Sequence, residues 1–380
     1  MDQFDWSLPG PARFLSNVEQ SILSGRNVVM ALPEYGPINI RQAMCERVKN
    51  RSYRDWFYVD MVAAENISIE PAIIVKEQCI PASRAYTAQA LASDEHFRNL
   101  VVYVDSIPRD QWPLWREFIE EYGHYCRFQP EQERAVFCIP VVGVRTSELP
   151  KEDITCAVHL WKGIVERIDV MLFVSQLFTG QKIPRLSKNL LGAIIVELAG
   201  TDLCFAAYLA TLDLESVLSP DSILRKLAHD RNWTSDTLGP QAEWALGERD
   251  MFDGDEIDHS ARVILQEDGK KKIEKRIWRG QLGVLFAFLE QRREEMLRRL
   301  GPYLSIPYSM KSGVITDKLD FELGHLLHIA RTAPRTAQIS ESTLRLLNDL
   351  AEIRHRLAHL EPVPWEMLNT TELRIFFACS

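Results

Sequence analysis

Arg354 and His359 are the residues of this sequence whose types and spacing best suit a chemical reaction. They lie five positions apart in the segment 353–363. Histidine titrates near neutral pH and can transfer protons, whereas arginine is a permanent cation that binds phosphate through two parallel hydrogen bonds. The pair therefore favours proton transfer beside a phosphate group.

A single predicted helix positions both residues. It begins near Ser340, a favourable N-cap, and is ended by Pro362 and Pro364. Arg354 and His359 lie off its apolar stripe, where they can line a cleft near the helix end. The stripe that should face a core consists of Leu346, Leu350, Ile353, Leu357 and Leu360.

The segment resembles the R-x-x-x-x-H signature of HEPN domains, especially the Abi-like group. Arg354 matches the motif arginine and His359 the motif histidine, while His355 stands where many members have asparagine. Active members of that family are metal-independent ribonucleases that work as dimers. The resemblance implies that His359 exchanges a proton with the ribose 2′-hydroxyl or the leaving oxygen, and that Arg354 stabilises the phosphorane. His355 is a third candidate catalytic residue. The surrounding pattern is matched by Arg356, Ala358, Glu361 and Pro362.

Two other interpretations of the motif are open. Arg354 and His359 could form a helix-end salt-bridge and capping pair that is favourable with the helix dipole. A metal site is also geometrically possible, because His355 and His359 are four residues apart with Glu352 nearby. The zincin pattern H-E-x-x-H is absent, since Arg356 occupies the glutamate position. On another helix, Glu322 and His325 could line the same cleft.

A long basic helix is predicted over 270–300, and its buried face would be apolar. The simplest interpretation is a core helix with a solvated charged face. The alternative is a stripe that contacts the phosphates of RNA or DNA. Its weak candidate residues for nucleic-acid binding are Lys271, Lys272, Lys275, Arg276 and Arg279.

The first 145 residues predict an α/β domain with a parallel sheet. Short, continuously apolar runs indicate strands buried on both faces, and helical stretches at 38–49 and 111–122 alternate with them. The predicted strands are 27–32, 56–59, 100–105 and 135–139.

A phosphate-binding loop of the form G-x-x-x-x-G-K-[ST] is degenerate in this domain. Ala31 takes the place of the first glycine, Pro37 that of the lysine and Ile38 that of the Ser/Thr. Pro37 supplies neither a cation nor a backbone N–H. Asp105 ends a strand that resembles a Walker B strand, and Ser106 stands where a catalytic glutamate is usual. Residues 10–145 therefore resemble an AAA-type P-loop domain that has lost its catalytic residues, which implies no ATP hydrolysis and leaves weak nucleotide binding open.

The predicted organisation has three parts. Residues 1–150 form the degenerate P-loop domain and 261–380 form the HEPN-like helical domain. Between them, 151–260 is a helical middle region with a strong helix at 156–178 and a solvated acidic loop within 230–260. Whether the helices of 150–230 belong to the first or the last domain is open. The acidic cluster of the loop comprises Glu248, Asp250, Asp253, Asp255, Glu256 and Asp258.

Composition narrows the function classes. The 380 residues carry a net charge of -9, which disfavours a general DNA-coating protein. The seven cysteines show no C-x-x-C spacing, so we expect reduced thiols and no cysteine-based metal site. The N-terminal residues lack a secretory signal pattern, and the apolar region 190–212 is interrupted by Glu197 and Asp202. We expect a cytoplasmic protein with no membrane span and no cofactor.

The two resemblances together predict a bacterial anti-phage defence protein. The first hypothesis is a HEPN ribonuclease that acts as a homodimer on RNA under the control of a pseudo-NTPase domain. The second is a non-catalytic adaptor or scaffold subunit that binds protein partners in a multi-protein defence complex. The degenerate P-loop favours the adaptor, and the intact R-x-x-x-x-H pattern favours the nuclease.

Overall fold

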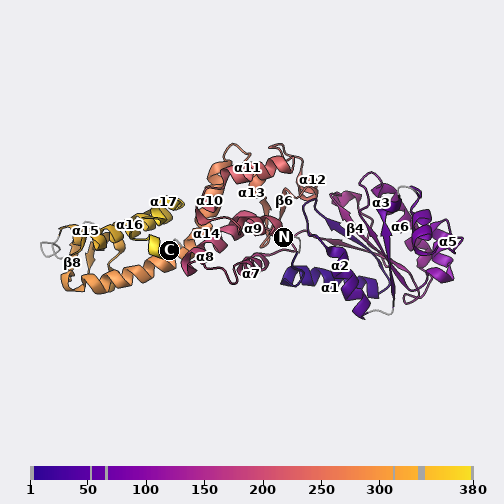
Figure 1. The fold of residues 1–380 in the computed structure, drawn as a ribbon, viewed down its shortest axis with the longest axis horizontal. Helices are drawn as coiled ribbons and strands as arrows, with labels where there is room; N and C mark the ends of the chain where they lie inside the picture. The colour runs from indigo at the N-terminus through magenta and orange to yellow at the C-terminus, as the bar shows by residue number, and fades with distance from the viewer. Residues whose placement is uncertain (1–3, 52–53, 65–66, 311–312, 333–338, 378–380) are drawn as a thin grey trace. The chain divides into compact units, whose positions relative to one another are not determined.

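The chain forms two compact units, each built from several chain segments (Figure 1). A computed structural model describes residues 4–51, 54–64, 67–310, 313–332 and 339–377. Unit 1 comprises 1–170, 201–203 and 236–259, and unit 2 comprises 171–200, 204–235 and 260–380. Among the described residues, no helix has the length and apolar character needed to cross a membrane.

Unit 1 is organised around a five-stranded parallel sheet with the order β2-β3-β4-β1-β5. The interior strand β1, between β4 and β5, is buried at every position, as the apolar run after Asn27 predicts. The predicted strands β1 and β3 are confirmed with their bounds unchanged. The strands are β1 (Asn27–Leu32), β2 (Asp55–Asp60), β3 (Leu100–Asp105), β4 (Val136–Val142) and β5 (Cys156–Leu160).

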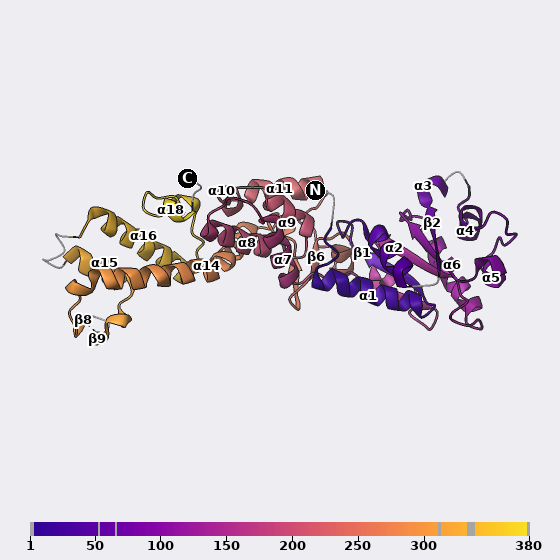
Figure 2. The same ribbon diagram turned by 60° about the horizontal axis from the view of Figure 1, so that its bottom comes forward.

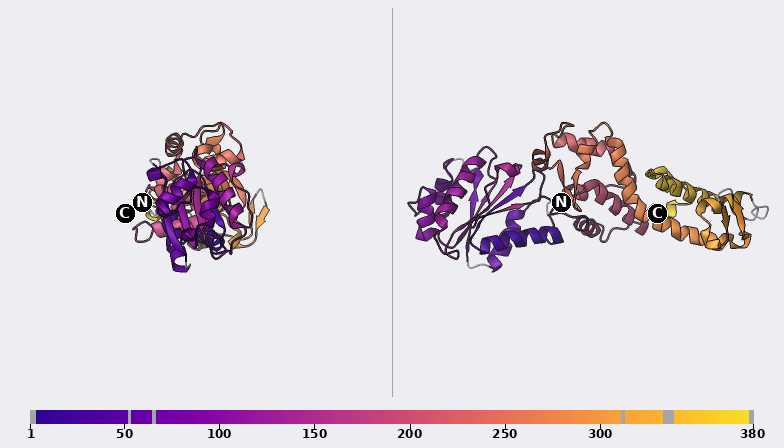
Figure 3. Two further views of the ribbon diagram at one scale, coloured as in Figure 1. Left: turned by 90° about the vertical axis from the view of Figure 1, so that its right-hand side faces the viewer. Right: turned by 180° about the vertical axis from the view of Figure 1, so that it is seen from behind.

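Helices cover both faces of this sheet (Figures 1 and 3). On one face α1 (Pro9–Leu23) contacts α2 (Ile40–Arg51), and on the other α4 (Pro71–Cys79) and α5 (Ala88–Ser93) contact α6 (Trp112–Cys126). β1 and β4 are neighbours, but the chain leaves them in opposite directions, toward β2 and toward β5. In open α/β sheets such a switch point opens a crevice at the carboxyl ends of the strands. The short helix α3 (Met61–Ala64) follows β2.

The predicted helix at 156–178 begins too early. Its first residues form the edge strand β5, in which Cys156 pairs with Asn27 and Leu160 with Ala31 of β1. The helix itself is α7 (Arg167–Leu177). Residues 156–160 pair with the backbone of β1 on the side opposite β4. This long-range pairing overrides the local helical pattern. The sheet therefore extends beyond the predicted domain boundary at residue 150.

The predicted solvated acidic loop contains a β-hairpin made of β6 (Arg249–Phe252) and β7 (Asp255–Asp258). Its two turn residues, Asp253 and Gly254, both have positive φ, as a type I′ turn requires. Three of the acidic side chains form ion pairs, and two of these three, Asp253 and Glu256, remain exposed as predicted. Glu256 accepts from Lys162 Nζ at 2.8 Å, Asp253 from Arg167 Nε at 2.7 Å, and Asp258 from Arg249 Nε at 2.8 Å. The helix α12 (Pro240–Ala245) precedes the hairpin.

In its described residues, unit 2 is helical apart from the short antiparallel strands β8 and β9. Its longest helix, α14 (Gly269–Leu300), packs against α8 (Arg185–Ala199). A Cβ atom at Gly280 would lie 2.7 Å from Ile194 Cα, so glycine is what permits this close approach. The remaining elements are α9 (Leu203–Leu209), α10 (Leu214–Leu218), α11 (Asp221–Asp230), α13 (Ser260–Val263), β8 (Tyr308–Met310), β9 (Gly313–Ile315), α15 (Leu323–Thr332), α16 (Glu341–Ala358), α17 (Trp365–Leu368) and α18 (Arg374–Phe377).

α16, the helix that carries the candidate motif, packs against α14 and α15 (Figure 2). The predicted N-cap is confirmed, because the Ser340 hydroxyl accepts from the Thr343 amide. The buried stripe is Leu347, Leu350, Ile353 and Leu357, with Leu347 buried in place of the expected Leu346.

The carboxyl end of α16 is closed by a left-handed turn at Leu360, which has a φ of 62°. The Glu361 amide donates to Arg356 O at 3.0 Å and the Leu360 amide to Leu357 O at 3.3 Å. These are the two hydrogen bonds of a Schellman cap, in which glycine is the usual left-handed residue. Leu360 is 60% exposed, contrary to its predicted place in the core.

Candidate functional site

The first candidate site is the motif at the end of α16, where Arg354 is engaged by a carboxylate. Its Nη2 atom lies 2.8 Å from Glu322 Oε2, and the two side chains are 36% and 44% exposed. The structure thus brings Arg354 together with Glu322, one of the two residues expected from the sequence to lie near the motif. A half-exposed pair of this kind contributes little to stability, but it occupies the arginine that would have to hold a phosphate.

His355 and His359 form a second, separate pair. Their rings lie 4.3 Å apart between centroids, one helical turn from each other, and both residues are exposed. Five residues along a helix correspond to a rotation of roughly 140° beyond a full turn, so Arg354 and His359 leave α16 on different sides. Within the described residues, no interaction joins Arg354 to His359.

The neighbouring motif residues hold the chain reversal after α16. Arg356 Nε donates to Pro362 O at 3.0 Å, and its guanidinium lies 3.4 Å from Glu361. His359 is itself the helix C-cap. His325 Nδ1, on the adjacent helix, accepts from the Glu322 amide at 3.1 Å. Among the described residues, no group of three or more His, Cys, Asp or Glu side chains is arranged to hold a metal ion.

Three of the five candidate cations of the basic helix have partners in unit 2. Lys272 lies 2.9 Å from Asp268, and Arg279 lies 3.2 Å from Glu197. Arg276 donates to the Ser260 hydroxyl at 2.6 Å. Lys271 and Lys275 are exposed.

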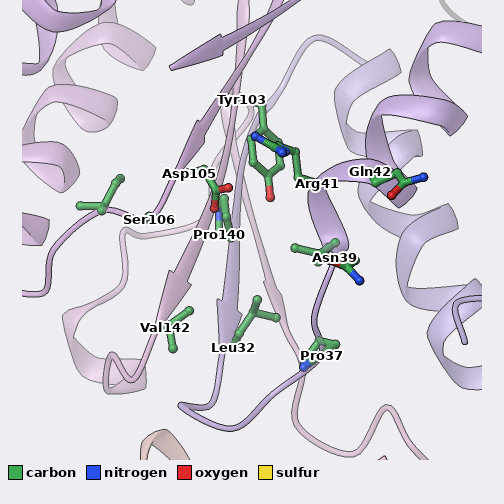
Figure 4. Close-up of a pocket in the computed structure, with 12 residues that line it drawn as sticks. Leu32, Pro37, Asn39, Arg41, Gln42, Tyr103, Asp105, Ser106, Pro140 and Val142 are labelled. Atoms are coloured by element: carbon green, nitrogen blue, oxygen red, sulfur yellow. The ribbon is translucent and has the colours of Figure 1, made fainter. Parts of the chain in front are cut away.

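The second candidate site is a pocket of about 380 Å³ at the carboxyl ends of β1, β3 and β4, beside the start of α2 (Figure 4). It lies at the switch point between β1 and β4, where ligands bind in sheets of this type. Three positions singled out from the sequence, Pro37, Asp105 and Ser106, line it. The other lining residues are Leu32, Asn39, Ile40, Arg41, Gln42, Tyr103, Ile107, Pro140 and Val142.

Tyr103 is the most unusual residue of the pocket. Its side chain is fully buried, and its hydroxyl has no hydrogen-bond partner among the described residues. Burial raises the pKa of the phenol far above its ordinary value, with the nearby Asp105 charge adding to the effect, so the group is neutral. In Figure 4 the hydroxyl points toward the middle of the lining residues. A buried polar group without a partner is costly and calls for an explanation.

Arg41 and Asp105 bring opposite charges to the same pocket. The Arg41 guanidinium lies 4.4 Å from the centre of the Tyr58 ring, a cation–π arrangement. Burial and the Asp105 charge raise the pKa of Tyr58, while Arg41 opposes the shift. Among the described residues, no ion pair of 4.0 Å or less involves Arg41 or Asp105.

Two backbone positions in the pocket wall adopt an uncommon conformation. Asn39 and Ser106 have φ values of 61° and 58°, in the left-handed region. Asparagine adopts this conformation more readily than most residues, whereas a serine is held there by the surrounding structure, and such strained positions cluster at binding sites.

Sequence reasoning identified the pocket region but missed Arg41 and Tyr103. A signal for Tyr103 was present, because it interrupts an aliphatic strand and lies two residues before Asp105, on the same face of β3. Arg41 lies in the first turn of α2, and no motif in the sequence pointed to it.

The comparisons with known proteins add no family. No protein-family model matches the sequence, and no curated protein matches it.

Proposed function

We propose that the protein is a non-catalytic adaptor whose α/β unit binds a small ligand in the pocket beside α2 and does not hydrolyse a nucleotide. The observation that carries this proposal is the Tyr103 hydroxyl, which is buried in the pocket and has no hydrogen-bond partner in the described part of the chain. A ligand that bonds to this hydroxyl would remove an otherwise uncompensated desolvation penalty.

Hydrolysis is disfavoured by the residues at the decisive positions. Pro37 cannot offer a phosphate the amide or the cation that a phosphate-binding loop supplies, and Ser106 cannot act as a carboxylate base. The likeness of unit 1 to a degenerate P-loop domain and of 353–363 to HEPN domains connects the adaptor to anti-phage defence complexes, where its partners would be other proteins.

The test combines an ATPase assay with a ligand search on the full chain. We expect no ATP turnover above that of a heat-denatured sample, and we expect at least one small metabolite to raise the melting temperature of the wild type. That increase should be smaller in Tyr103→Phe. The control is Tyr125→Phe, whose partly exposed ring lies on α6 outside the pocket. Turnover of ATP, or no stabilising ligand in a broad metabolite library, would contradict the proposal.

A second candidate function is a HEPN-type ribonuclease. It is favoured by the exposure of His355 and His359, whose imidazoles are accessible to an RNA strand. Because Arg354 and His359 leave the helix on different sides, this function requires a homodimer in which each copy completes the other's site.

The ribonuclease is tested by RNA cleavage in the presence of EDTA. The comparison is between the wild type, an Arg354→Ala/His359→Ala double variant and a His229→Ala control, whose imidazole is exposed on α11. Cleavage that only the double variant abolishes would support the nuclease, and absence of cleavage across varied RNAs would remove it.

A further inference from the structure

We propose that the ligand of the α2 pocket is a zwitterion of the α-amino-acid class with an apolar side chain. The inference rests on the proposed function, because it assumes that the pocket is a ligand site. It goes further by assigning a chemical class from the charges, the helix end and the apolar wall that meet there.

The pocket lining contains one positive and one negative side chain. Arg41 and Asp105 both line it, and within the described residues neither is in an ion pair. A purely anionic ligand would meet the Asp105 carboxylate, and a purely cationic ligand would meet the Arg41 guanidinium. A ligand that carries both charges satisfies each group and is repelled by neither.

The start of α2 determines which part of the pocket would hold the carboxylate of the ligand. This helix is 12 residues long and has no acidic residue in its first turn. Its first amides and the positive end of its dipole favour a carboxylate, and Arg41 lies in that same turn. The ammonium group is then assigned to Asp105, at the end of β3.

The Tyr103 hydroxyl provides an independent observation. The Tyr103 side chain is fully buried and belongs to the lining of the pocket, and no described residue forms a hydrogen bond with its hydroxyl. A neutral phenol donates one hydrogen bond and accepts others, so it can bond to a carboxylate or to an ammonium group. Two residues along β3, Asp105 lies on the same face. Figure 4 shows Arg41 and Asp105 to either side of the Tyr103 ring.

The remaining wall selects the side chain. Leu32, Ile40, Pro140 and Val142 present apolar surface to the pocket. A volume of about 380 Å³ holds one small molecule. A nucleoside triphosphate would place several negative charges beside Asp105 without the lysine that normally neutralises them.

The experiment measures binding of matched probes to the full chain by isothermal titration calorimetry. Each apolar α-amino acid is compared with its deaminated acid and its decarboxylated amine; for leucine these are 4-methylpentanoate and 3-methylbutylamine. We expect at least one amino acid to bind tenfold or more tightly than both of its truncated analogues. Inorganic phosphate and AMP are included as anionic probes.

Two charge variants assign the contacts. Asp105→Asn should reduce the preference for the amino acid over the deaminated acid to less than threefold, and Arg41→Gln should do the same for its preference over the amine. Asp110→Asn and Arg109→Gln, exposed on the loop after β3 and outside the pocket lining, should leave both ratios unchanged.

The outcomes separate this inference from the proposed function. Phosphate or AMP binding in a Tyr103-dependent manner, with no amino acid bound, would overturn the zwitterion and leave a ligand-binding pocket standing. Equal binding of an amino acid and its deaminated acid would also overturn it. If no probe and no library compound binds, both proposals fail.

Discussion

The α2 pocket of unit 1 and the end of α16 in unit 2 differ in whether their polar side chains have partners within the protein. In the pocket, the Tyr103 hydroxyl is buried and has no hydrogen-bond partner within the residues that the structure describes. At the end of α16, Arg354 is paired with Glu322 and Arg356 with Glu361. The motif arginines are thus engaged by nearby carboxylates, whereas the unused bonding capacity of Tyr103 supports the proposal of a ligand site.

The largest expected effect separates the two units. Gly280→Val should lower the unfolding free energy of unit 2 by about 3 kcal/mol, because its Cβ would meet the backbone of α8. Urea denaturation with limited proteolysis should show unit 2 cleaved first, and unit 1 should keep its native resistance to the protease. Gly283→Ala is the control on the same helix. A Cβ atom at Gly283 would have open space around it. The higher helix propensity of alanine should therefore raise the unfolding free energy of unit 2 by about 1 kcal/mol. Equal losses for the two variants would contradict the α8–α14 packing.

The pH dependence of stability should also differ between the two units. In unit 1, burial raises the pKa of Asp250 to about 6, although the amides of Met251 and Gly163 oppose the shift. Since the folded state disfavours the ionised form, the stability of unit 1 should fall as the pH rises from about 4 to about 6. Asp250→Asn should flatten this part of the unfolding profile.

The control for this pH effect is in unit 2. Hydrogen bonds from Ser216 lower the pKa of Asp213, so its contribution is lost only as the pH falls below the ordinary range of aspartate. Asp213→Asn should leave the profile between pH 4 and 6 unchanged. The same slope in wild type and Asp250→Asn would refute the assignment.

Tyr103→Phe tests the unused hydroxyl directly. Removing a buried hydroxyl that has no partner should raise the unfolding free energy of unit 1 by about 1 kcal/mol while it weakens ligand binding. Tyr122→Phe is the matched variant, because that buried hydroxyl donates to Ala135 O at 3.1 Å and its loss should cost about 1 kcal/mol. Chemical denaturation of both variants measures the contrast. Destabilisation by Tyr103→Phe would mean that the hydroxyl is already bonded.

The smallest effect concerns the end of α16. Leu360→Gly should raise the stability of unit 2 by about 0.5 kcal/mol, because glycine relieves the left-handed conformation and the leucine buries little surface. Ala358→Gly, within the helix, should lower it by a similar amount. Thermal unfolding measures both changes, and a loss in Leu360→Gly would show that the exposed side chain contributes more than the strain.

The fold was predictable where local pattern and long-range pairing agree. The bounds of β1 and β3 follow from uninterrupted apolar runs, and the Ser340 cap follows from its residue type. β5 was missed because its five residues become a strand only by pairing with β1. The β6–β7 hairpin was missed although its Asp253-Gly254 turn is a local signal.

The sites were predictable only in part. Asp105 and Pro37 follow from strand ends and from the loop pattern, and both line the pocket. Arg41 and Tyr103 meet only because β3 lies two places from β1 in the sheet, an order that the sequence does not encode locally. The ion pair of Arg354 with Glu322 likewise depends on how α15 packs against α16.

The interrupted course of unit 1 has a consequence for synthesis on the ribosome. Its sheet is complete by residue 160, but the β6–β7 hairpin that binds Lys162 and Arg167 ends only at residue 258. At roughly 5–20 residues per second, the ribosome needs several seconds to add this stretch. During that interval the nascent unit would expose the surface that the hairpin covers, which makes it a candidate substrate for chaperones that bind emerging chains.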